Sequence, residues 1–414
     1  MKLGKYSFGT GDRFGLQGLA QLRAIEKVEK QGFSIVPVWN KSHREHEIIH
    51  TTPESVRKEA DHAVTKLNWD NPYFVDADHI TMDTVDDFLD YSDFFTIDVA
   101  DYIGKGASAE DVKEYIEDNK SFIGELHIPG IAQSFSIDES FLEEIANRYL
   151  VAIREAARIY KHIKKEKGDQ VVTEISMDEV EEPQTPVELF FILKTIAEQG
   201  VRINTIAPKF TGRFNKGVDY VGNLDKFKEE FEQDVLVIDY VVKEYNLPKG
   251  LKLSVHSGSD KFSIYEPMHQ IIKKHDAGLH VKTSGTTWLE ELIGLASVGH
   301  DGLKMVQTIY ATAWNRFEEL TKPYAPVIDI DYNNLPTPDT FKKWNGDDIA
   351  AMLTHNPDDP AFDSQLRQFM HCSYKIAAEQ GSAYLDLLKK YEKTIGMNVT
   401  YNLFERHLKP LFLK

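Results

Sequence analysis

The feature that most constrains the fold is a series of eight short apolar segments, each of which runs into polar or glycine-rich residues. The segments have the β-branched and aromatic bias of buried parallel strands, and helical patterns lie between them. This alternation predicts an α/β fold, a TIM-type (β/α)8 barrel. The expected strands span residues 6–10, 34–39, 73–77, 94–99, 171–177, 202–207, 252–255 and 279–281.

A doubly wound open sheet is the rival fold. No Gly-x-Gly-x-x-Gly sequence follows an expected strand, which weakens the dinucleotide-binding version of that rival. About 70 residues separate the fourth strand from the fifth, so we expect an insertion there, with a long helix that Asp138 caps and Gly168 ends. We expect the barrel to occupy residues 1–325 and a C-terminal helical extension, residues 326–414, to pack on it.

Composition excludes several classes of partner. The chain has 48 basic and 66 acidic residues and a net charge of −18, so it repels nucleic acid and anionic membranes. The first residues lack the apolar run of a signal peptide, and no stretch approaches the ~18 apolar residues of a membrane span. Cys372 is the one cysteine, so an intrachain disulfide cannot form. We therefore expect a cytoplasmic protein without nucleic-acid or membrane partners.

Polar residues at the strand ends predict an active site, because these ends meet at one rim of a barrel. Strand alternation directs polar sets from the fifth, seventh and eighth strands into the barrel mouth. These sets are Glu174, Ser176 and Asp178; Ser254 and His256; and His280 and Lys282. A carboxylate with two such histidines suits Mn, Fe, Co, Ni or Zn better than Ca. The competing histidines are His43, His46, His50, His79 and His127.

A second candidate constellation would bind an anion. Ser284-Gly285-Thr286 leads from the eighth strand into an expected helix, and backbone N–H groups at a helix start attract carboxylate or phosphate. A simple helix cap is the alternative. The cations expected at the same rim are Arg13, Lys41, Arg44, Lys209, Lys261 and Lys282.

Taken in order, the strand-end motifs resemble the tagaturonate epimerase family of bacterial hexuronate catabolism. The strongest are Leu253-Ser254-Val255-His256-Ser257-Gly258-Ser259-Asp260-Lys261-Phe262 and His280-Val281-Lys282-Thr283-Ser284-Gly285-Thr286. Shorter matches lie at 37–42, 44–46, 75–80, 96–101, 176–179, 207–210 and 216–220. The resemblance departs mildly at Glu182 and Asn215. It implies that the protein interconverts D-tagaturonate and D-fructuronate with the help of a divalent metal cation.

That reaction would invert the carbinol that corresponds to C4 of a ketohexose, which is not adjacent to the C2 ketone. Direct enolisation cannot lower the acidity of this C–H bond, and no nicotinamide fingerprint supports a transient oxidation, so we expect retro-aldol cleavage between C3 and C4 and re-addition. The hypothesis makes Asp178 and Asp260 the catalytic acid–base pair and Glu179, His256 and His280 the metal ligands. Asp178 and Glu179 could exchange roles. The expected substrate-binding residues are Lys41, Arg44, Asp78, Lys209, Lys282 and Thr286.

Three other functions stay open at this stage. A metal-dependent sugar isomerase would use similar ligands on the same barrel. An aldolase would form a Schiff base on Lys282 or Lys209 and would not need a metal. A sugar-acid-binding protein without activity would not need so many ionisable groups at one rim. The expected partner is a small sugar acid, and a homo-oligomer is an open alternative to a monomer.

Overall fold

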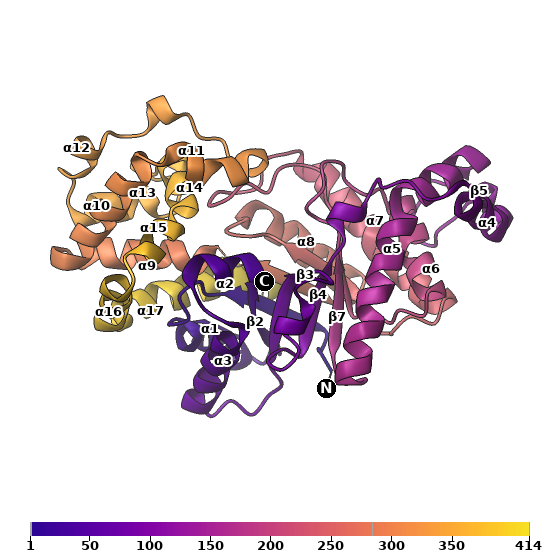
Figure 1. Ribbon diagram of the computed structural model, residues 1–414, viewed down its shortest axis with the longest axis horizontal. Coiled ribbons are helices and arrows are strands. Elements are labelled where there is room, and N and C mark those ends of the chain that lie inside the picture. Colours follow the sequence, from indigo (N-terminus) through magenta and orange to yellow (C-terminus); the bar gives the residue numbers. More distant parts are fainter. Residues whose placement is uncertain (1, 284, 414) are drawn as a thin grey trace.

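The computed structural model, which describes residues 2–283 and 285–413, contains a closed barrel of eight parallel strands in the order β1-β10-β9-β8-β7-β4-β3-β2. The predicted (β/α)8 barrel is therefore confirmed (Figure 1). Each expected strand is present, with ends that differ by up to three residues. The barrel strands are β1 (Tyr6–Gly11), β2 (Val36–Ser42), β3 (Phe74–Ile80), β4 (Phe94–Asp98), β7 (Val172–Ser176), β8 (Thr205–Ala207), β9 (Lys252–His256) and β10 (Leu279–Thr283).

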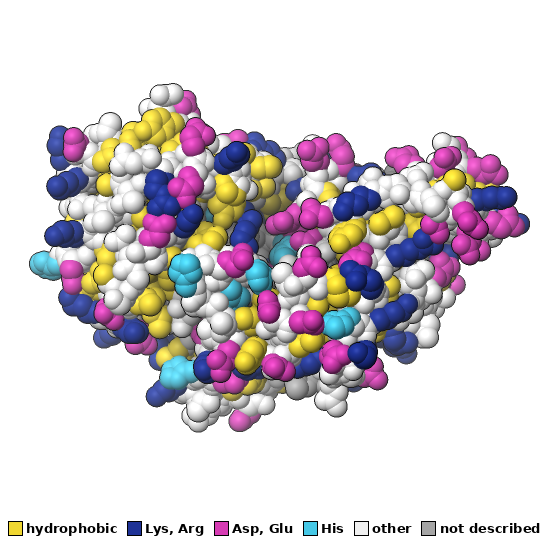
Figure 2. Space-filling view, viewed as in Figure 1, with side chains coloured by type: hydrophobic (Ala, Val, Ile, Leu, Met, Phe, Trp, Pro, Cys, Tyr) yellow, Lys and Arg dark blue, Asp and Glu magenta, His cyan; other side chains and the backbone are white. Residues whose placement is uncertain are grey.

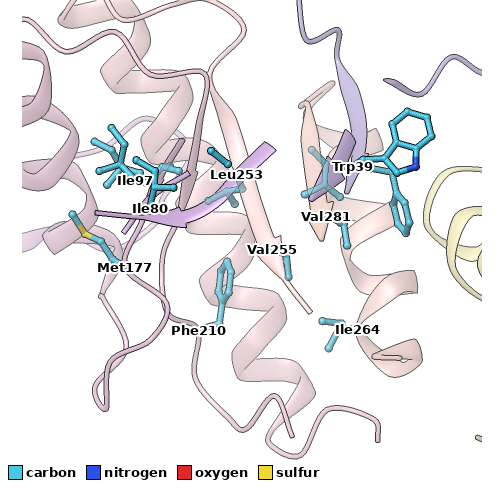
Figure 3. Packing of buried hydrophobic residues seen from close by; sticks show 14 of the residues in the cluster. Trp39, Ile80, Ile97, Met177, Phe210, Leu253, Val255, Ile264 and Val281 are labelled. Atoms are coloured by element: carbon cyan, nitrogen blue, oxygen red, sulfur yellow. The ribbon is translucent and has the colours of Figure 1, made fainter. Parts of the chain in front are cut away.

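Helices surround the barrel. They are α1 (Gly18–Glu29), α2 (His43–Ile49), α3 (Pro53–Leu67), α6 (Pro186–Glu198), α7 (Leu224–Glu244), α8 (Phe262–Lys274) and α9 (Thr286–Ser297), with short 3-10 turns η1 (Val85–Asp87) and η2 (Ala100–Tyr102). Their apolar faces pack against the outward side chains of the strands, such as Leu253, Val255 and Val281 (Figure 3). No helix in the described ranges has the length and apolar character needed to cross a membrane.

The insertion expected between the fourth and fifth strands is present. It contains α4 (Ala109–Asn119), η3 (Lys120–Phe122), an antiparallel pair of β5 (Gly124–Leu126) and β6 (Phe135–Ile137), and α5 (Glu139–Lys167). The predicted cap of α5 is confirmed, because the Asp138 carboxylate accepts the Phe141 N–H at 2.7 Å and Gly168 follows the last turn. The hairpin and α4 project from the barrel at one end of the molecule (Figure 1).

The remaining helices gather at the opposite end of the molecule and over the barrel (Figure 1). They are α10 (His300–Trp314), α11 (Phe317–Thr321), α12 (Pro338–Phe341), α13 (Gly346–Leu353), α14 (Ser364–Cys372), α15 (Tyr374–Glu379), α16 (Ser382–Lys390), α17 (Glu392–Tyr401) and the π-helix η6 (Asn402–Leu413), with 3-10 turns η4 (Lys322–Val327) and η5 (Tyr332–Asn334). α13 and α17 pack on α9, and η6 packs on α1 and α8. The boundary at residue 325 stays a prediction, since α10 also contacts α12, α15 and α16.

The barrel interior changes character along its axis. A small apolar cluster fills its N-terminal end and consists of Leu3, Val36, Val38, Phe74, Phe94 and Val172. Further along the same strands, inward positions carry polar residues, so that Phe74 is followed by Asp76 and Val172 by Glu174. The apolar cluster closes the barrel at the N-terminal ends of the strands, and the polar interior opens at their C-terminal ends.

Candidate active site

A cavity of about 250 Å³ opens at the C-terminal ends of the strands, as the barrel fold predicts. Figure 2 shows the surface hollowed between the C-terminal helices and the barrel, with acidic and histidine side chains in the hollow. A larger cavity of about 370 Å³ lies at the other end of the strands, beside α7. Its acid and imidazole side chains, Asp239, His275 and Asp276, do not form a close group of the kind found at the rim, so we place the active site at the rim.

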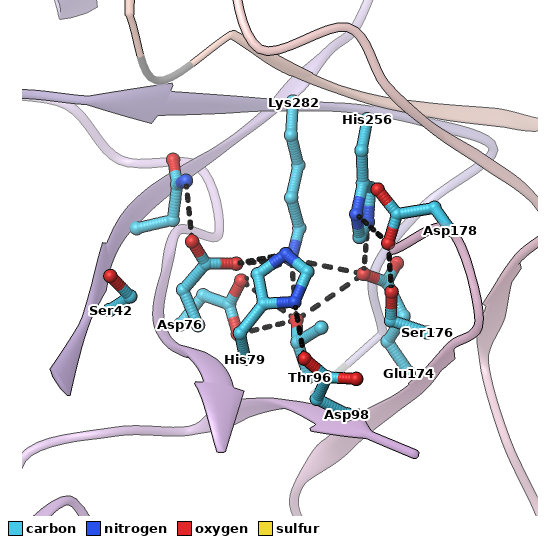
Figure 4. A network of polar contacts seen from close by, with 12 residues as sticks. Ser42, Asp76, His79, Thr96, Asp98, Glu174, Ser176, Asp178, His256 and Lys282 are labelled. Atoms are coloured by element: carbon cyan, nitrogen blue, oxygen red, sulfur yellow. Dashed lines mark hydrogen bonds and ion pairs between the residues drawn. The ribbon is translucent and has the colours of Figure 1, made fainter. Parts of the chain in front are cut away.

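Lys282 of β10 organises the polar interior of the barrel (Figure 4). Its ammonium lies 2.7 Å from Asp76, 3.0 Å from Asp78 and 2.9 Å from Glu174. Burial disfavours the charged ammonium, but these three carboxylates outweigh that effect and raise the Lys282 pKa well above its ordinary value. Lys282 and Glu174 therefore face the barrel interior, as strand alternation predicts, and Lys282 stays protonated.

His79, Asp178 and His256 form the one group of three acid or imidazole side chains whose ligand atoms lie within 4.8 Å of one another, among the residues that the structure describes. His79 stands at the end of β3 with a left-handed backbone (φ 52°), where the register between β3 and β4 shifts. This irregularity breaks strict strand alternation. The sequence predicts His79 only as one of several competing histidines, and strand alternation does not single it out.

Each imidazole of this group has one nitrogen held by a carboxylate. Nδ1 of His79 donates to Asp98 at 3.1 Å, and Nε2 of His256 donates to Glu174 at 2.8 Å. The second nitrogen of each ring also faces a carboxylate: Nε2 of His79 lies 3.9 Å from Asp78, and Nδ1 of His256 lies 3.2 Å from Asp178. Histidines that bind a metal have this arrangement, because a carboxylate fixes the ring and its tautomer.

The charges of the group are strongly coupled. Burial lowers the pKa of His256, but Asp178 and Glu174 outweigh it and raise that pKa to about 9. Burial raises the pKa of Asp178, and the histidines reverse this and hold it well below its ordinary value. Burial also lowers the pKa of His79, which nearby carboxylates, Asp78 first, raise well above the ordinary value. A cation in this position would replace the ring protons as the partner of the carboxylate.

Glu179 and Lys209 flank this group. Glu179 lines the cavity and is exposed. Lys209 lines a small side cavity together with Asp178 and His256. Burial lowers the pKa of Lys209, and the structure gives its ammonium no ion pair with another described residue. Glu179 is placed to exchange a proton or a hydrogen bond with a molecule in the cavity, and Lys209 lies on the neighbouring side cavity next to Asp178 and His256.

Two residues predicted to act in the site lie apart from the group. His280 is fully buried in the barrel, where Nδ1 hydrogen-bonds with Ser7 Oγ at 2.9 Å and the ring packs on Phe94. Burial lowers its pKa to about 3, so the ring is neutral. Asp260 is also fully buried and does not line the cavity, and Thr286 donates to it at 3.1 Å.

The C-terminal helices surround Asp260. Arg367 Nη2 lies 2.7 Å from its carboxylate, His355 Nδ1 lies 3.2 Å away and His407 Nε2 lies 3.3 Å away. Arg367 also donates to the carbonyl oxygen of Gly217. This cluster connects the C-terminal region to the loops after β8 and β9. We term Asp260 a structural anchor for that reason. Ser284, the first residue of the expected anion-binding turn, lies outside the described residues.

Some of the remaining predicted substrate-binding residues line the cavity, and one does not. Asp78 and Arg44 line the cavity, as Lys282 does. Lys41 is buried and does not line the cavity; it lies on the outward face of β2, where its charge acts on the buried carboxyl of Glu59.

The lining also includes Asp98, Lys216, Tyr324 and Tyr374, which were not predicted as site residues. The last three come from a loop and from the C-terminal helices. No strand pattern marks them in the sequence.

Comparisons with known proteins agree on one family. The family model of the tagaturonate epimerases matches residues 1–411. A tagaturonate/fructuronate epimerase from Thermotoga maritima is 28% identical over 416 aligned residues, which cover 97% of this chain and 79% of that protein. The glycerol-complexed crystal structure of a fructuronate-tagaturonate epimerase from Cohnella laeviribosi has a TM-score of 0.82 at 23% identity, covering 99% of this chain and 82% of the other.

A probable tagatose 6-phosphate kinase from Sinorhizobium meliloti shares the fold more distantly, with a TM-score of 0.51 at 9% identity over 98% of this chain and 100% of that one. The family match extends over nearly the whole chain and agrees with the resemblance of the strand-end motifs. This chain therefore belongs to the tagaturonate epimerase family, and it is an isomerase.

Proposed function

We propose that the protein interconverts D-tagaturonate and D-fructuronate in the cytoplasm, with a divalent cation held by His79, Asp178 and His256. Family membership supports the substrate pair. The observation that carries the metal proposal is the pairing of each imidazole with its own carboxylate, which leaves one nitrogen of each ring beside Asp178. Mixed imidazole and carboxylate ligation suits Mn, Fe, Co, Ni or Zn.

This ligand set shares His256 with the set expected from the sequence and replaces the other two members. His280 does not belong to the group whose ligand atoms lie within 4.8 Å of one another and does not line the cavity, and Glu179 is placed to face the substrate instead. Asp178 is thus a ligand in this proposal, and Glu179 takes the role of the base. Asp260 is a structural anchor, because Arg367 and two histidines occupy its carboxylate.

A bound cation would polarise the C2 ketone as a Lewis acid. Glu179 removes the proton of the C4 hydroxyl, the C3–C4 bond breaks, and its electron pair moves to C3 and into the C2 carbonyl while C4 becomes an aldehyde. The aldehyde fragment rotates, and C3 attacks its other face. Lys209, whose lowered pKa favours proton transfer, returns a proton to the new C4 oxygen. The sugar gains and loses no atom, C4 keeps its hydrogen, and proton exchange with solvent returns Glu179 and Lys209 to their starting states.

The structure argues against an aldolase that forms a Schiff base on Lys282. Lys282 is protonated and held by three carboxylates, so it cannot attack a carbonyl. Lys209 meets the requirements of a nucleophile better, since burial lowers its pKa. Reduction with borohydride in the presence of substrate distinguishes the two functions: a stable adduct on Lys209 would favour the aldolase, and its absence favours the epimerase.

The metal site is tested with His79→Ala and His256→Ala, and with His62→Ala, an exposed histidine of α3, as the matched control. Each protein is stripped with a chelator, reloaded with Mn, Ni or Zn, and assayed for bound metal by elemental analysis and for turnover of D-tagaturonate by NMR. We expect the control to bind about one metal ion and turn over, and the two variants to lose at least about tenfold in metal affinity. Full metal binding by both variants would refute the ligand set.

A further inference from the structure

Two sets of side chains of different character line the cavity. One is the His79, Asp178 and His256 group. The other is Arg13, Arg44 and Lys216, which gather around two neighbouring tyrosine rings and which we term the cationic corner. These three cations come from the end of β1, from α2 and from the loop after β8. The chain carries a net charge of −18, so a pocket wall made of cations runs against its overall charge.

The cationic corner is poorly neutralised. The structure gives Arg44 and Lys216 no carboxylate within 4.0 Å among the described residues. Arg13 has one such partner there, Glu45, at 3.3 Å from its Nε. Nη1 of Arg13 is buried and makes no hydrogen bond. A buried donor of a charged group without a partner is costly, which indicates that a ligand supplies the missing acceptor.

Two tyrosine rings contact the cations of the corner and do not neutralise their charge. The guanidinium of Arg13 lies 4.0 Å from the ring centre of Tyr374, and Tyr324 has Arg44 at 5.6 Å and Lys216 at 6.0 Å. Such cation–π contacts orient a cation and leave its N–H donors available to an anion.

His371 lies beside Gly217, the residue that follows Lys216 of the cationic corner. It is buried, and neither of its ring nitrogens has a hydrogen-bond partner. Burial and the charges of Arg13 and Lys216 keep the pKa of His371 well below its ordinary value, so its ring adds no charge to the corner.

We propose that Arg13, Arg44 and Lys216 bind the carboxylate of the sugar acid. The inference rests on the proposed function, because in a hexuronate the C6 carboxylate and the C2 ketone are at opposite ends of the molecule. A substrate that spans the cavity puts its carboxylate in the cationic corner while C2 to C4 face the metal-binding group. Lys282, which the sequence predicts as a substrate-binding residue, is already paired with three carboxylates of the protein.

The test compares Lys216→Gln and Arg44→Gln with Lys304→Gln, an exposed lysine of α10 outside the cavity. KM and kcat are measured with D-tagaturonate, and the inhibition constant is measured for D-tagatose, its uncharged counterpart. We expect KM to rise about tenfold in the two corner variants, with kcat and the inhibition constant for D-tagatose changed less than about twofold. Lys216→Arg keeps the charge and is expected to restore KM to within about threefold of wild type.

An unchanged KM in both corner variants would overturn the proposal, and so would an equal loss for D-tagatose, which would mean that the residues only shape the cavity. If wild-type protein fails to turn over D-tagaturonate, the proposed function fails, and calorimetric titration with D-galacturonate and with inorganic phosphate then tests the corner by itself. Binding of the uronate that Lys216→Gln abolishes would keep the proposal. Preference for phosphate, or no binding of either anion, would overturn it.

Discussion

Replacing Lys282 by methionine removes a cation that lies among three buried carboxylates. The ammonium is 2.7, 3.0 and 2.9 Å from Asp76, Asp78 and Glu174, and the side chains are at most 8% exposed. Breaking a buried ion pair from one side costs about 3–5 kcal/mol, because the remaining charge has lost its partner. At about 2 °C per kcal/mol, the Tm of Lys282→Met should fall by about 6–10 °C.

The pH dependence of this loss has a defined sign. Burial raises the pKa of Asp76 to about 6 even with Lys282 present, and removal of the cation raises it further. A carboxyl whose pKa is higher in the folded protein than in the unfolded chain favours folding while it is protonated, and this stability is lost as the pH rises through the folded pKa. The Tm difference between variant and wild type should therefore be larger at pH 8 than at pH 5.

Thermal unfolding followed by circular dichroism at both pH values measures the effect. The double variant Lys282→Met with Asp76→Asn has one carboxylate fewer and should recover part of the lost Tm. A fall of less than about 2 °C at pH 8, or a double variant less stable than the single one, would show that uncompensated charge is not the cause.

Three further outcomes are expected. Glu179→Gln should lower kcat by about 100-fold or more while bound metal stays unchanged, and a normal kcat would remove Glu179 as the base. Asp260→Asn should lower the free energy of unfolding by about 3 kcal/mol, since it leaves the buried Arg367 without its anion; denaturant titration with unchanged stability would contradict the anchor role. Burial raises the pKa of Glu290 to about 7, so its charge costs stability as the pH rises from about 4.5 through 7. Glu290→Gln should then become more stable than wild type by up to about 3 kcal/mol at pH 8, and equal Tm values across this range would refute the assignment.

The barrel could be predicted from the sequence because its signals are local. Each strand is a short apolar run with a polar end, and alternation correctly directed Glu174, His256 and Lys282 into the same interior. The choice among histidines could not be made in this way. His79 occupies its position through a left-handed residue and a register shift, and neither of these has a periodic signature.

The environment of Asp260 depended on parts of the chain more than 90 residues away. In the sequence it looks like a rim acid next to His256-Ser257-Gly258. In the fold it meets Arg367 from α14 and His407 from η6, and it is fully enclosed. The same holds for Tyr324 and Tyr374, which reach the cavity only because the C-terminal helices pack over the barrel mouth.

The most direct test of the proposed reaction is proton NMR of D-tagaturonate with metal-loaded protein in D2O. A retro-aldol inversion keeps the original hydrogen on C4, so we predict D-fructuronate that carries protium at C4 and that forms only when the cation is present. Formation of D-fructuronate with deuterium at C4 would contradict the retro-aldol route. Turnover that survives complete removal of metal would contradict the role of the His79, Asp178 and His256 group, and no turnover with any of the metals would contradict the proposed function.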